Sequence, residues 1–213
     1  MSQDQDLIQF QSTHTDHEGK PLAVDGVMGP RTLWAMAVDS LRYERKVVLA
    51  RAIESIGIRE VPMGSNRGPD IDYWLQRCGV TIPPKGVAAP QNAWCAAYIS
   101  WVLSQANWRE FKYARVYDFV HKSGLKQITV EQTQPSDLGC FLQPDGTGHI
   151  WLLTGKEMTE KGWVTMNIEG NTSNAVRCTL REHTPRTMYL QTFGAAASAG
   201  IIKSVPFASS STT

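Results

Sequence analysis

The chain has 213 residues, of which 42% are hydrophobic and 19% are charged, and its formal net charge at pH 7 is +1. This composition excludes a disordered or fibrous chain. A near-neutral chain also presents no strong field to nucleic acid or to an anionic membrane, so we expect no nucleic-acid partner. At this length the chain can bury a sizeable core in one or two domains.

Residues 1–40 are predicted to form a small helical module. Leu7, Ile8 and Phe10 begin a helical pattern, which a polar stretch follows. The turn V-D-G-V-M-G-P then leads into a second helix, which we expect to begin at Thr32.

Residues 41–192 are predicted to form an α+β domain. The first half carries helical patterns, among them one that starts at Pro69 and a buried one over residues 93–106. Beyond Pro135 the runs L-G-C-F-L, H-I-W-L-L-T, W-V-T-M-N-I-E and M-Y-L-Q-T-F are typical of antiparallel strands. Helices followed by such strands favour the α+β class. Residues 193–213 are small and polar, and we expect this tail to be partly mobile.

No targeting or membrane-spanning segment is expected. The opening M-S-Q-D-Q-D-L-I-Q-F lacks the basic and apolar regions of a secretory signal. We therefore expect the protein to be made and kept in the cytoplasm unless another machine moves it. The apolar stretch from Trp94 to Val102 is far shorter than a bilayer span, so no membrane insertion is expected. The four cysteines include no C-x-x-C pair, and we expect free thiols.

Cys95 is the strongest candidate for a chemical role. It stands at the expected start of the buried helix, after a Pro-rich loop. The positive end of the helix dipole and the unpaired N–H groups make a thiolate nucleophile more available there. A lone cysteine is more often a small core residue, and the setting of Cys95 is what favours the nucleophile.

A nucleophilic thiol needs a base and a group that orients the base. His149 lies in G-T-G-H-I-W-L-L-T-G, where strand alternation puts it on the same face as Trp151. Glu169 and Asn171 stand two residues apart on the next strand and are expected to point the same way. Each residue alone also fits an ordinary strand end, so it is their order along the chain that suggests a catalytic set.

Four segments resemble the CHAP family of cysteine, histidine-dependent amidohydrolases and peptidases. They read G-I-R-E-V-P-M-G-S-N-R-G-P-D, N-A-W-C-A-A-Y, G-H-I-W-L-L-T-G and N-I-E-G-N-T-S, in the family's order, within roughly residues 45–190. A further segment, P-S-D-L-G-C-F, has Ser136 where the family often has glycine. The resemblance implies a papain-like fold with the nucleophile at a helix start and the base on the sheet.

The resemblance also implies the role of each residue. It matches Cys95 to the nucleophile, His149 to the general base, Glu169 to the third member of the triad and Asn171 to a nearby polar residue. We expect Trp94 and Trp151 to line a substrate groove. The backbone N–H of Cys95 is the first expected oxyanion donor, and the second is Gln91 or Asn92.

No metal and no cofactor are expected. Some CHAP domains carry a calcium loop of aspartates before the nucleophile, but this chain has G-V-A-A-P-Q-N-A there, with no carboxylate. The segment V-D-G-V-M-G-P-R-T-L-W-A-M resembles the turn and helix of short peptidoglycan-binding modules. That match covers only part of such a module, which leaves open whether residues 1–40 are a truncated module and whether they bind the wall.

Together the resemblances imply a hydrolase that cleaves an amide bond of bacterial peptidoglycan, the bond to muramic acid or one within the peptide. Two settings fit: a phage-type endolysin, or an injected antibacterial effector with secretion machinery and an immunity protein as partners. Either would act on the wall after release or delivery. Two alternatives are a non-catalytic wall-binding protein and a toxin that modifies another amide or acyl substrate with the same Cys–His site.

Overall fold

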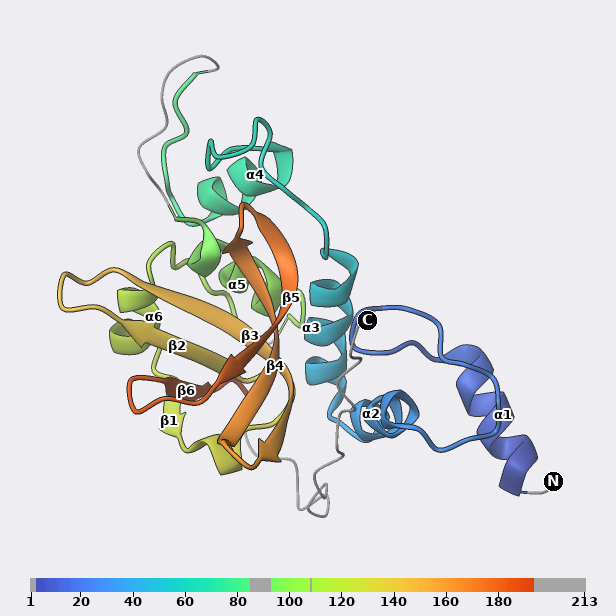
Figure 1. Ribbon diagram of the computed structural model, residues 1–213. Helices are drawn as coiled ribbons and strands as arrows, with labels where there is room; N and C mark the ends of the chain where they lie inside the picture. Colours follow the sequence, from blue (N-terminus) through green and yellow to red (C-terminus); the bar gives the residue numbers. More distant parts are fainter. Residues whose placement is uncertain (1–2, 85–92, 108, 194–213) are drawn as a thin grey trace, which may run out of the picture.

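The computed structural model describes residues 3–84, 93–107 and 109–193 (Figure 1). Within this part the helices are α1 (Gln3–Thr13), α2 (Pro30–Asp39), α3 (Tyr43–Glu54), α4 (Pro69–Arg77), α5 (Cys95–Ser104) and α6 (Val116–Lys122). The strands are β1 (Lys126–Ile128), β2 (Leu138–Leu142), β3 (Gly148–Thr159), β4 (Gly162–Thr172), β5 (Ala175–Glu182) and β6 (Met188–Gln191). They form one antiparallel sheet in the order β1-β6-β2-β3-β4-β5. The predicted α+β class, with helices preceding an antiparallel sheet, is confirmed.

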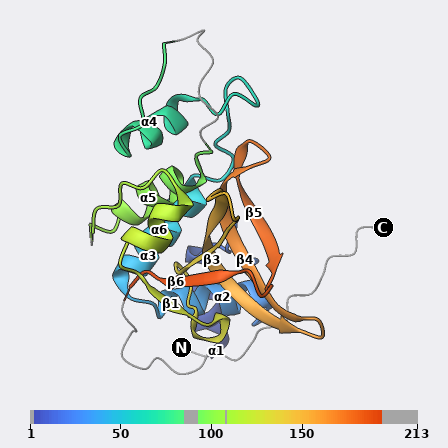
Figure 2. The ribbon, with the colours of Figure 1, turned by 90° about the vertical axis from the view of Figure 1, so that its left-hand side faces the viewer.

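Helices cover one face of the sheet (Figure 2). α5 contacts β3 and β4, α6 contacts β2 and β3, and both α3 and α4 pack against α5. α5 is the helix predicted over residues 93–106, and its Tyr98, Ile99 and Val102 side chains are fully buried. A helix that is apolar on nearly every side must be enclosed, which explains its place between the other helices and the sheet.

The central strand β3 shows the predicted alternation of faces. Ile150 and Leu152 belong to the main core beneath the helices. Trp151 belongs to a second, smaller apolar cluster that includes Tyr189 of β6. His149 therefore lies on the Trp151 side of the strand, as the period of two requires.

Two strands were not predicted, β1 and β5. β5 reads A-V-R-C-T-L-R-E, a run in which polar and apolar side chains alternate with two arginines among them. Within the sheet it is an edge strand paired with β4, and its first residue Ala175 also bridges to Arg59 after α3. An edge strand tolerates exposed charged side chains, so a sequence with this composition still pairs.

In the N-terminal module, α2 lies next to α3, and α1 lies farther from the main body than α2 (Figure 1). The buried Gln11 side chain holds the turn between α1 and α2: its Nε2 donates to the Asp25 carboxylate at 2.9 Å, and its Oε1 accepts from the Gly26 N–H at 2.9 Å. α2 begins at Pro30, two residues before the expected Thr32. Proline suits the first helical turn because its missing N–H has no partner there in any case.

The module and the main body are in direct contact. Trp34 of α2 donates its indole N–H to the carbonyl oxygen of Thr154 in β3 at 2.8 Å.

At the C-terminal end of the described residues, Phe193 was expected in the tail, but its side chain is buried in the main core. Residues 194–213 of the expected tail lie outside the described residues. Among the helices of the described segments, none is long and apolar enough to cross a membrane.

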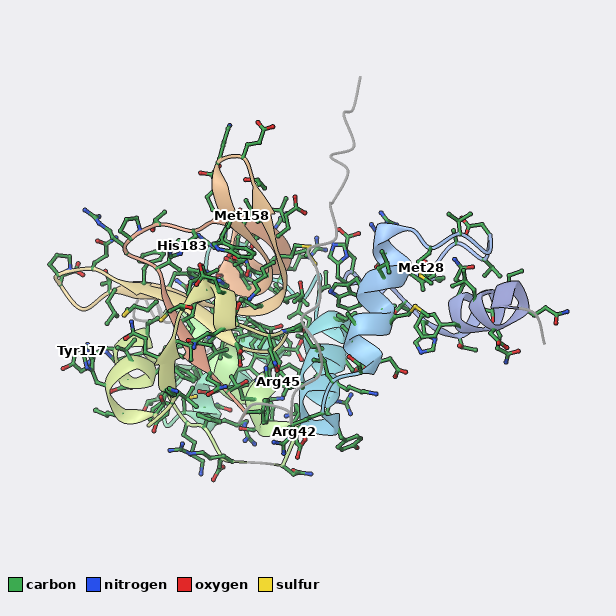
Figure 3. The ribbon with its side chains drawn as sticks, turned by 90° about the horizontal axis from the view of Figure 1, so that it is seen from below. Met28, Arg42, Arg45, Tyr117, Met158 and His183 are labelled. Atoms are coloured by element: carbon green, nitrogen blue, oxygen red, sulfur yellow. The ribbon has the colours of Figure 1, made fainter. Side chains whose placement is uncertain are left out.

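A buried ion pair joins α3 to the start of β2; Arg45 is labelled in Figure 3. The side chains of Arg45 and Asp137 are both 0% exposed, and Nη1 lies 2.9 Å from Oδ1. Arg45 also donates to the carbonyl oxygens of Pro135 at 2.8 Å and Phe193 at 3.0 Å. Asp137 accepts from the Thr192 N–H at 3.0 Å. The pair therefore connects α3, β2 and the segment after β6.

We expect Arg45→Met to lower the free energy of unfolding by about 3–5 kcal/mol, because Asp137 would stay buried without its cation. Lys46→Met is a matched control, since Lys46 pairs with Asp39 at the surface at 2.9 Å. Exposed pairs of this kind contribute less than about 1 kcal/mol. Urea unfolding, followed by circular dichroism, measures the free energy of unfolding of both variants. An equally small loss in Arg45→Met would show that the other donors to Asp137 suffice.

Candidate active site

Cys95 is the first residue of α5, as predicted, and Trp94 is its N-cap. The first hydrogen bond of the helix runs from the Tyr98 N–H to the Trp94 carbonyl oxygen at 2.9 Å. The N–H groups of the first turn, that of Cys95 included, have no partner within the helix. Unpaired N–H groups at a helix start stabilise negative charge that develops close to them, as in an acyl-transfer reaction.

His149 stands between Cys95 and Glu169. Its Nε2 lies 2.9 Å from Oε2 of Glu169, and the Cys95 side chain is near enough to interact with the ring. Because Nε2 faces the carboxylate, Nδ1 is the nitrogen left for the thiol. Burial by itself lowers the pKa of His149, but the interactions with Cys95 and Glu169 outweigh it and raise the pKa to about 9. Three residues predicted from separate segments are thus brought together.

Glu169 is fully buried and accepts several hydrogen bonds. Arg181 donates Nε to Oε1 at 2.5 Å and Nη2 to Oε2 at 2.7 Å. The hydroxyls of Thr179 and Thr172 donate to Oε1 and Oε2 respectively. Burial raises the pKa of Glu169, but the hydrogen bonds from Arg181, His149 and Thr179 lower it to about 2. The carboxylate is therefore ionised at neutral pH.

The expected place of Asn171 depends on regular alternation along β4, and the strand is irregular there. The pairing with β5 shifts between Glu169 and Thr172, and Asn171 has a φ of 63°, in the left-handed region. As a result Thr172, two residues beyond the glycine, reaches the site: its hydroxyl lies 3.5 Å from His149 Nε2 and 2.9 Å from Glu169 Oε2. The face shared by Glu169 and Asn171 was inferred from an unbroken strand, which the bulge interrupts.

The predicted site residues did not include Thr172, Thr179 or Arg181. The signal for two of them was present in β5, where Thr179 and Arg181 alternate and so share a face. It was missed because β5 was not predicted as a strand. Only the pairing of β4 with β5 places that face against Glu169.

The two tryptophans expected in a substrate groove are buried. Trp94 is 0% exposed, packs against Trp74 and donates its indole N–H to the carboxylate of Glu60 at 2.9 Å. Trp151 is 2% exposed and lies under the guanidinium of Arg181, 4.6 Å from its ring centre. Neither ring is open to a substrate, which corrects the expectation. Trp94 directly precedes Cys95 and Trp151 follows His149 by two residues, where the chain enters the core.

Gln91 and Asn92, the candidates for the second oxyanion donor, lie outside the described residues. Within the described segments, no group of three or more His, Cys, Asp or Glu side chains is placed to hold a metal ion.

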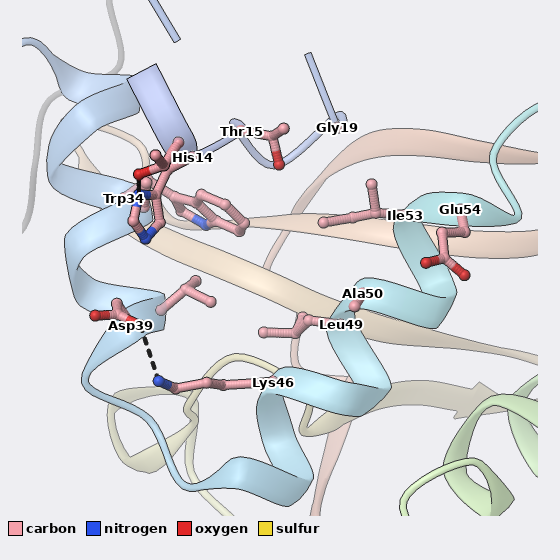
Figure 4. A pocket seen from close by; sticks show the side chains of 13 residues that line it. His14, Thr15, Gly19, Trp34, Asp39, Lys46, Leu49, Ala50, Ile53 and Glu54 are labelled. Carbon is pink, nitrogen blue, oxygen red and sulfur yellow. Dashed lines mark hydrogen bonds and ion pairs between the residues drawn. The ribbon is translucent and has the colours of Figure 1, made fainter. Parts of the chain in front are cut away.

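A cavity of about 390 Å³ lies away from this site, between the α1–α2 connection, α2 and α3 (Figure 4). Its walls include the Trp34 ring, Ile53 and the ion pair of Asp39 with Lys46, whose atoms are 2.9 Å apart. None of the residues that line it belongs to the Cys95–His149–Glu169 cluster. The cavity marks the junction between the N-terminal module and the main body.

The cluster has the arrangement that nucleophilic catalysis requires. A base lies within hydrogen-bonding reach of a thiol, and a buried carboxylate fixes the tautomer of the base. Such a set can transfer a proton from the thiol and return it to a leaving group. The described residues therefore hold the parts of a cysteine acyl-transfer site.

No protein-family model matches the chain, and no curated protein matches it significantly. Among solved structures, the chain is similar to RipD from Mycobacterium tuberculosis, which is described as a non-catalytic NlpC/p60 domain protein adapted to peptidoglycan binding. The TM-score is 0.43 and the sequence identity 15%, over 72% of this chain and 100% of the RipD chain. At these values the similarity carries no argument about activity.

Proposed function

We propose that this chain is a hydrolase of bacterial peptidoglycan that cleaves an amide bond through Cys95. The observation that carries the proposal is the chain of contacts from the helix-borne thiol to His149 and on to the buried carboxylate of Glu169. A wall-binding protein has no need for a thiol, a base and an ionised acceptor in that order. The choice of peptidoglycan as substrate rests on the resemblance of four segments to the CHAP family.

The reaction begins with proton transfer from the Cys95 thiol to Nδ1 of His149. The thiolate sulfur then attacks the carbonyl carbon of the amide, and the carbonyl oxygen takes the negative charge. The N–H of Cys95, at the start of α5, donates to that oxyanion. Glu169 stabilises the imidazolium through Nε2.

Collapse of the tetrahedral intermediate breaks the C–N bond. The imidazolium of His149 gives its proton to the leaving amine, so that a thioester to Cys95 and a free amine result. Water then attacks the thioester with His149 as the base, which releases a carboxylic acid and restores the thiol. Overall, one amide and one water are converted to one amine and one carboxylic acid, and the reaction needs no cofactor.

Digestion of purified peptidoglycan tests this function. We expect soluble fragments from the unmodified chain, with one new amino group and one new carboxyl group on the two sides of each cleaved bond, and none from Cys95→Ala. Mass spectrometry of the fragments then assigns the bond, either that between muramic acid and L-alanine or one within the peptide. Wall binding without fragments from the unmodified chain would favour the non-catalytic alternative. Neither binding nor fragments would favour a toxin with another amide or acyl substrate.

Chelation is a further test of the proposed chemistry. We expect EDTA to leave wall digestion unchanged, because no carboxylate cluster precedes Cys95 in the sequence. The measurement is the release of soluble fragments with and without chelator, with a known calcium-dependent wall hydrolase as the control. A loss of activity that calcium restores would contradict the prediction.

The pH dependence follows from the raised pKa of His149. The leaving amine needs the imidazolium, which loses its proton as the pH rises through about 9, so kcat/KM for digestion should fall above that pH. The same shift links to stability. The pKa of His149 is raised above its ordinary 6.5 in the folded state. Its contribution to the free energy of unfolding is therefore fully present below pH 6.5 and is lost as the pH rises through about 9. A rate that still increases at about pH 10 would be inconsistent with this role for the imidazolium.

The biological setting belongs to the proposal as well. An enzyme of this kind would be an endolysin or an injected antibacterial effector, made in the cytoplasm and acting on the wall after release or delivery. A gene for a holin beside this one would favour the endolysin. A gene for a periplasmic immunity protein would favour the effector.

A further inference from the structure

The carboxylate that orients His149 is itself held from the opposite side. Arg181 donates Nε to one oxygen of Glu169 and Nη2 to the other, at 2.5 and 2.7 Å. Two parallel hydrogen bonds of this kind fix the plane of a carboxylate as well as its position. His149 then meets Oε2 at 2.9 Å. The orientation of the imidazole thus depends on Arg181, which acts on it through Glu169.

Arg181 is itself held in place by an aromatic ring. Its guanidinium carbon lies 4.6 Å from the ring centre of Trp151, at a distance typical of a cation–π contact. Trp151 stands two residues after His149 on β3, and the two rings are stacked with centres 6.1 Å apart. Gly139 of the neighbouring strand makes room for this indole, since a Cβ there would lie 2.2 Å from its Nε1. The backbone of β2 therefore fixes the ring on which Arg181 rests.

Glu169 needs this cation because it is 0% exposed, whereas the Arg181 side chain is 32% exposed. Apart from Arg181 and His149, the side chains that donate to the carboxylate in the contacts described are the neutral hydroxyls of Thr172 and Thr179. A buried carboxylate with neutral donors alone tends to take up a proton. A protonated Glu169 would no longer stabilise an imidazolium at His149.

We propose that Arg181 is a positioning residue of this site: its guanidinium fixes the plane of the Glu169 carboxylate and keeps it ionised, so that His149 is oriented toward Cys95. The inference rests on the proposed catalytic role of the Cys95–His149 pair. It adds a fourth residue, on the edge strand β5, which acts on the thiol only through Glu169 and His149.

Alkylation of Cys95 by iodoacetamide tests the inference, because it reports the thiolate and needs no peptidoglycan. The full chain is compared with Arg181→Met and Arg181→Lys, and peptide mapping by mass spectrometry quantifies the modification of Cys95 at each pH. In Arg181→Met, Glu169 should protonate at a higher pH, so the acid limb of the alkylation profile should move up by at least about one pH unit, a tenfold loss of rate on that limb. Arg181→Lys keeps the positive charge but cannot make the two parallel hydrogen bonds to Glu169. It should therefore move the acid limb in the same direction by a smaller amount.

Arg177 of β5 lies opposite Glu169 in the pairing with β4 and is left unchanged in every variant. Arg51→Met is the matched control, since Arg51 lies on α3 and is exposed, where it pairs with Glu54 at 2.7 Å. Its profile should superimpose on that of the unmodified chain. Circular dichroism at each pH checks that every variant is folded. If Arg181→Met does not fold, Arg181→Gln, which keeps an amide donor but no charge, takes its place.

Two results would overturn the inference. One is a rate that falls by the same factor at every pH with the acid limb in place, which is what a merely structural role gives. The other is a shift of equal size in Arg51→Met. This test can fail or succeed independently of the proposed function. If the acid limb of Arg181→Met moves but the unmodified protein digests no peptidoglycan, the role of Arg181 stands and the wall hydrolase is rejected.

Discussion

Replacing Cys95 with alanine is expected to reduce wall digestion by roughly 10⁴-fold or more, because removal of a nucleophile leaves only binding and oxyanion stabilisation. Cys95 is the cysteine at the N-terminus of a helix and within reach of a histidine. The measurement is the initial rate of fragment release from purified peptidoglycan. The folded state is checked by circular dichroism.

The other cysteines provide matched controls. Burial raises the pKa of Cys140 to about 12 and that of Cys178 to about 11, and it also raises that of Cys78. These thiols are therefore protonated at neutral pH and poor nucleophiles. We expect Cys78→Ser, Cys178→Ser and Cys140→Ala to retain most of the turnover, with alanine chosen for Cys140 because its side chain is fully enclosed. Loss of activity in any of these folded variants would contradict the assignment of Cys95.

Replacing Glu169 with glutamine is expected to lower turnover by about 10² to 10⁴-fold, in the range of general acid–base partners. The buried carboxylate accepts from Arg181, two threonine hydroxyls and His149 Nε2. An amide has one acceptor oxygen, so its NH₂ group would face another donor. Either the arginine or the histidine would lose its partner, and the imidazolium would lose a charge-assisted hydrogen bond.

Asn171→Gly is the control for this comparison. Asn171 has a φ of 63°, which glycine adopts without strain, so the variant removes the side chain and keeps the backbone. We expect it to cost less than about tenfold if the side chain only helps to position the site. Steady-state rates on the same peptidoglycan preparation compare the two variants. A larger loss in folded Asn171→Gly than in Glu169→Gln would make the amide the third member of the catalytic set.

Much of the site followed from local patterns. The start of a buried apolar helix at Cys95 and the alternation that separates His149 from Ile150 are properties of short segments. Their periods of 3.6 and two can be read without knowing the partners of each segment. The order of thiol, histidine and carboxylate along the chain therefore indicated the chemistry, and the resemblance to the CHAP family added the expected roles.

The sequence by itself determined the α+β class and the three residues of the proposed triad. The tertiary structure alone decided that Thr172 and Arg181 contact Glu169 and that Trp94 and Trp151 are buried. The first depends on a bulge and on the pairing of an edge strand, and the second on which side chains the folded core encloses. Both are set by contacts between segments distant in sequence, which local periodicity does not specify.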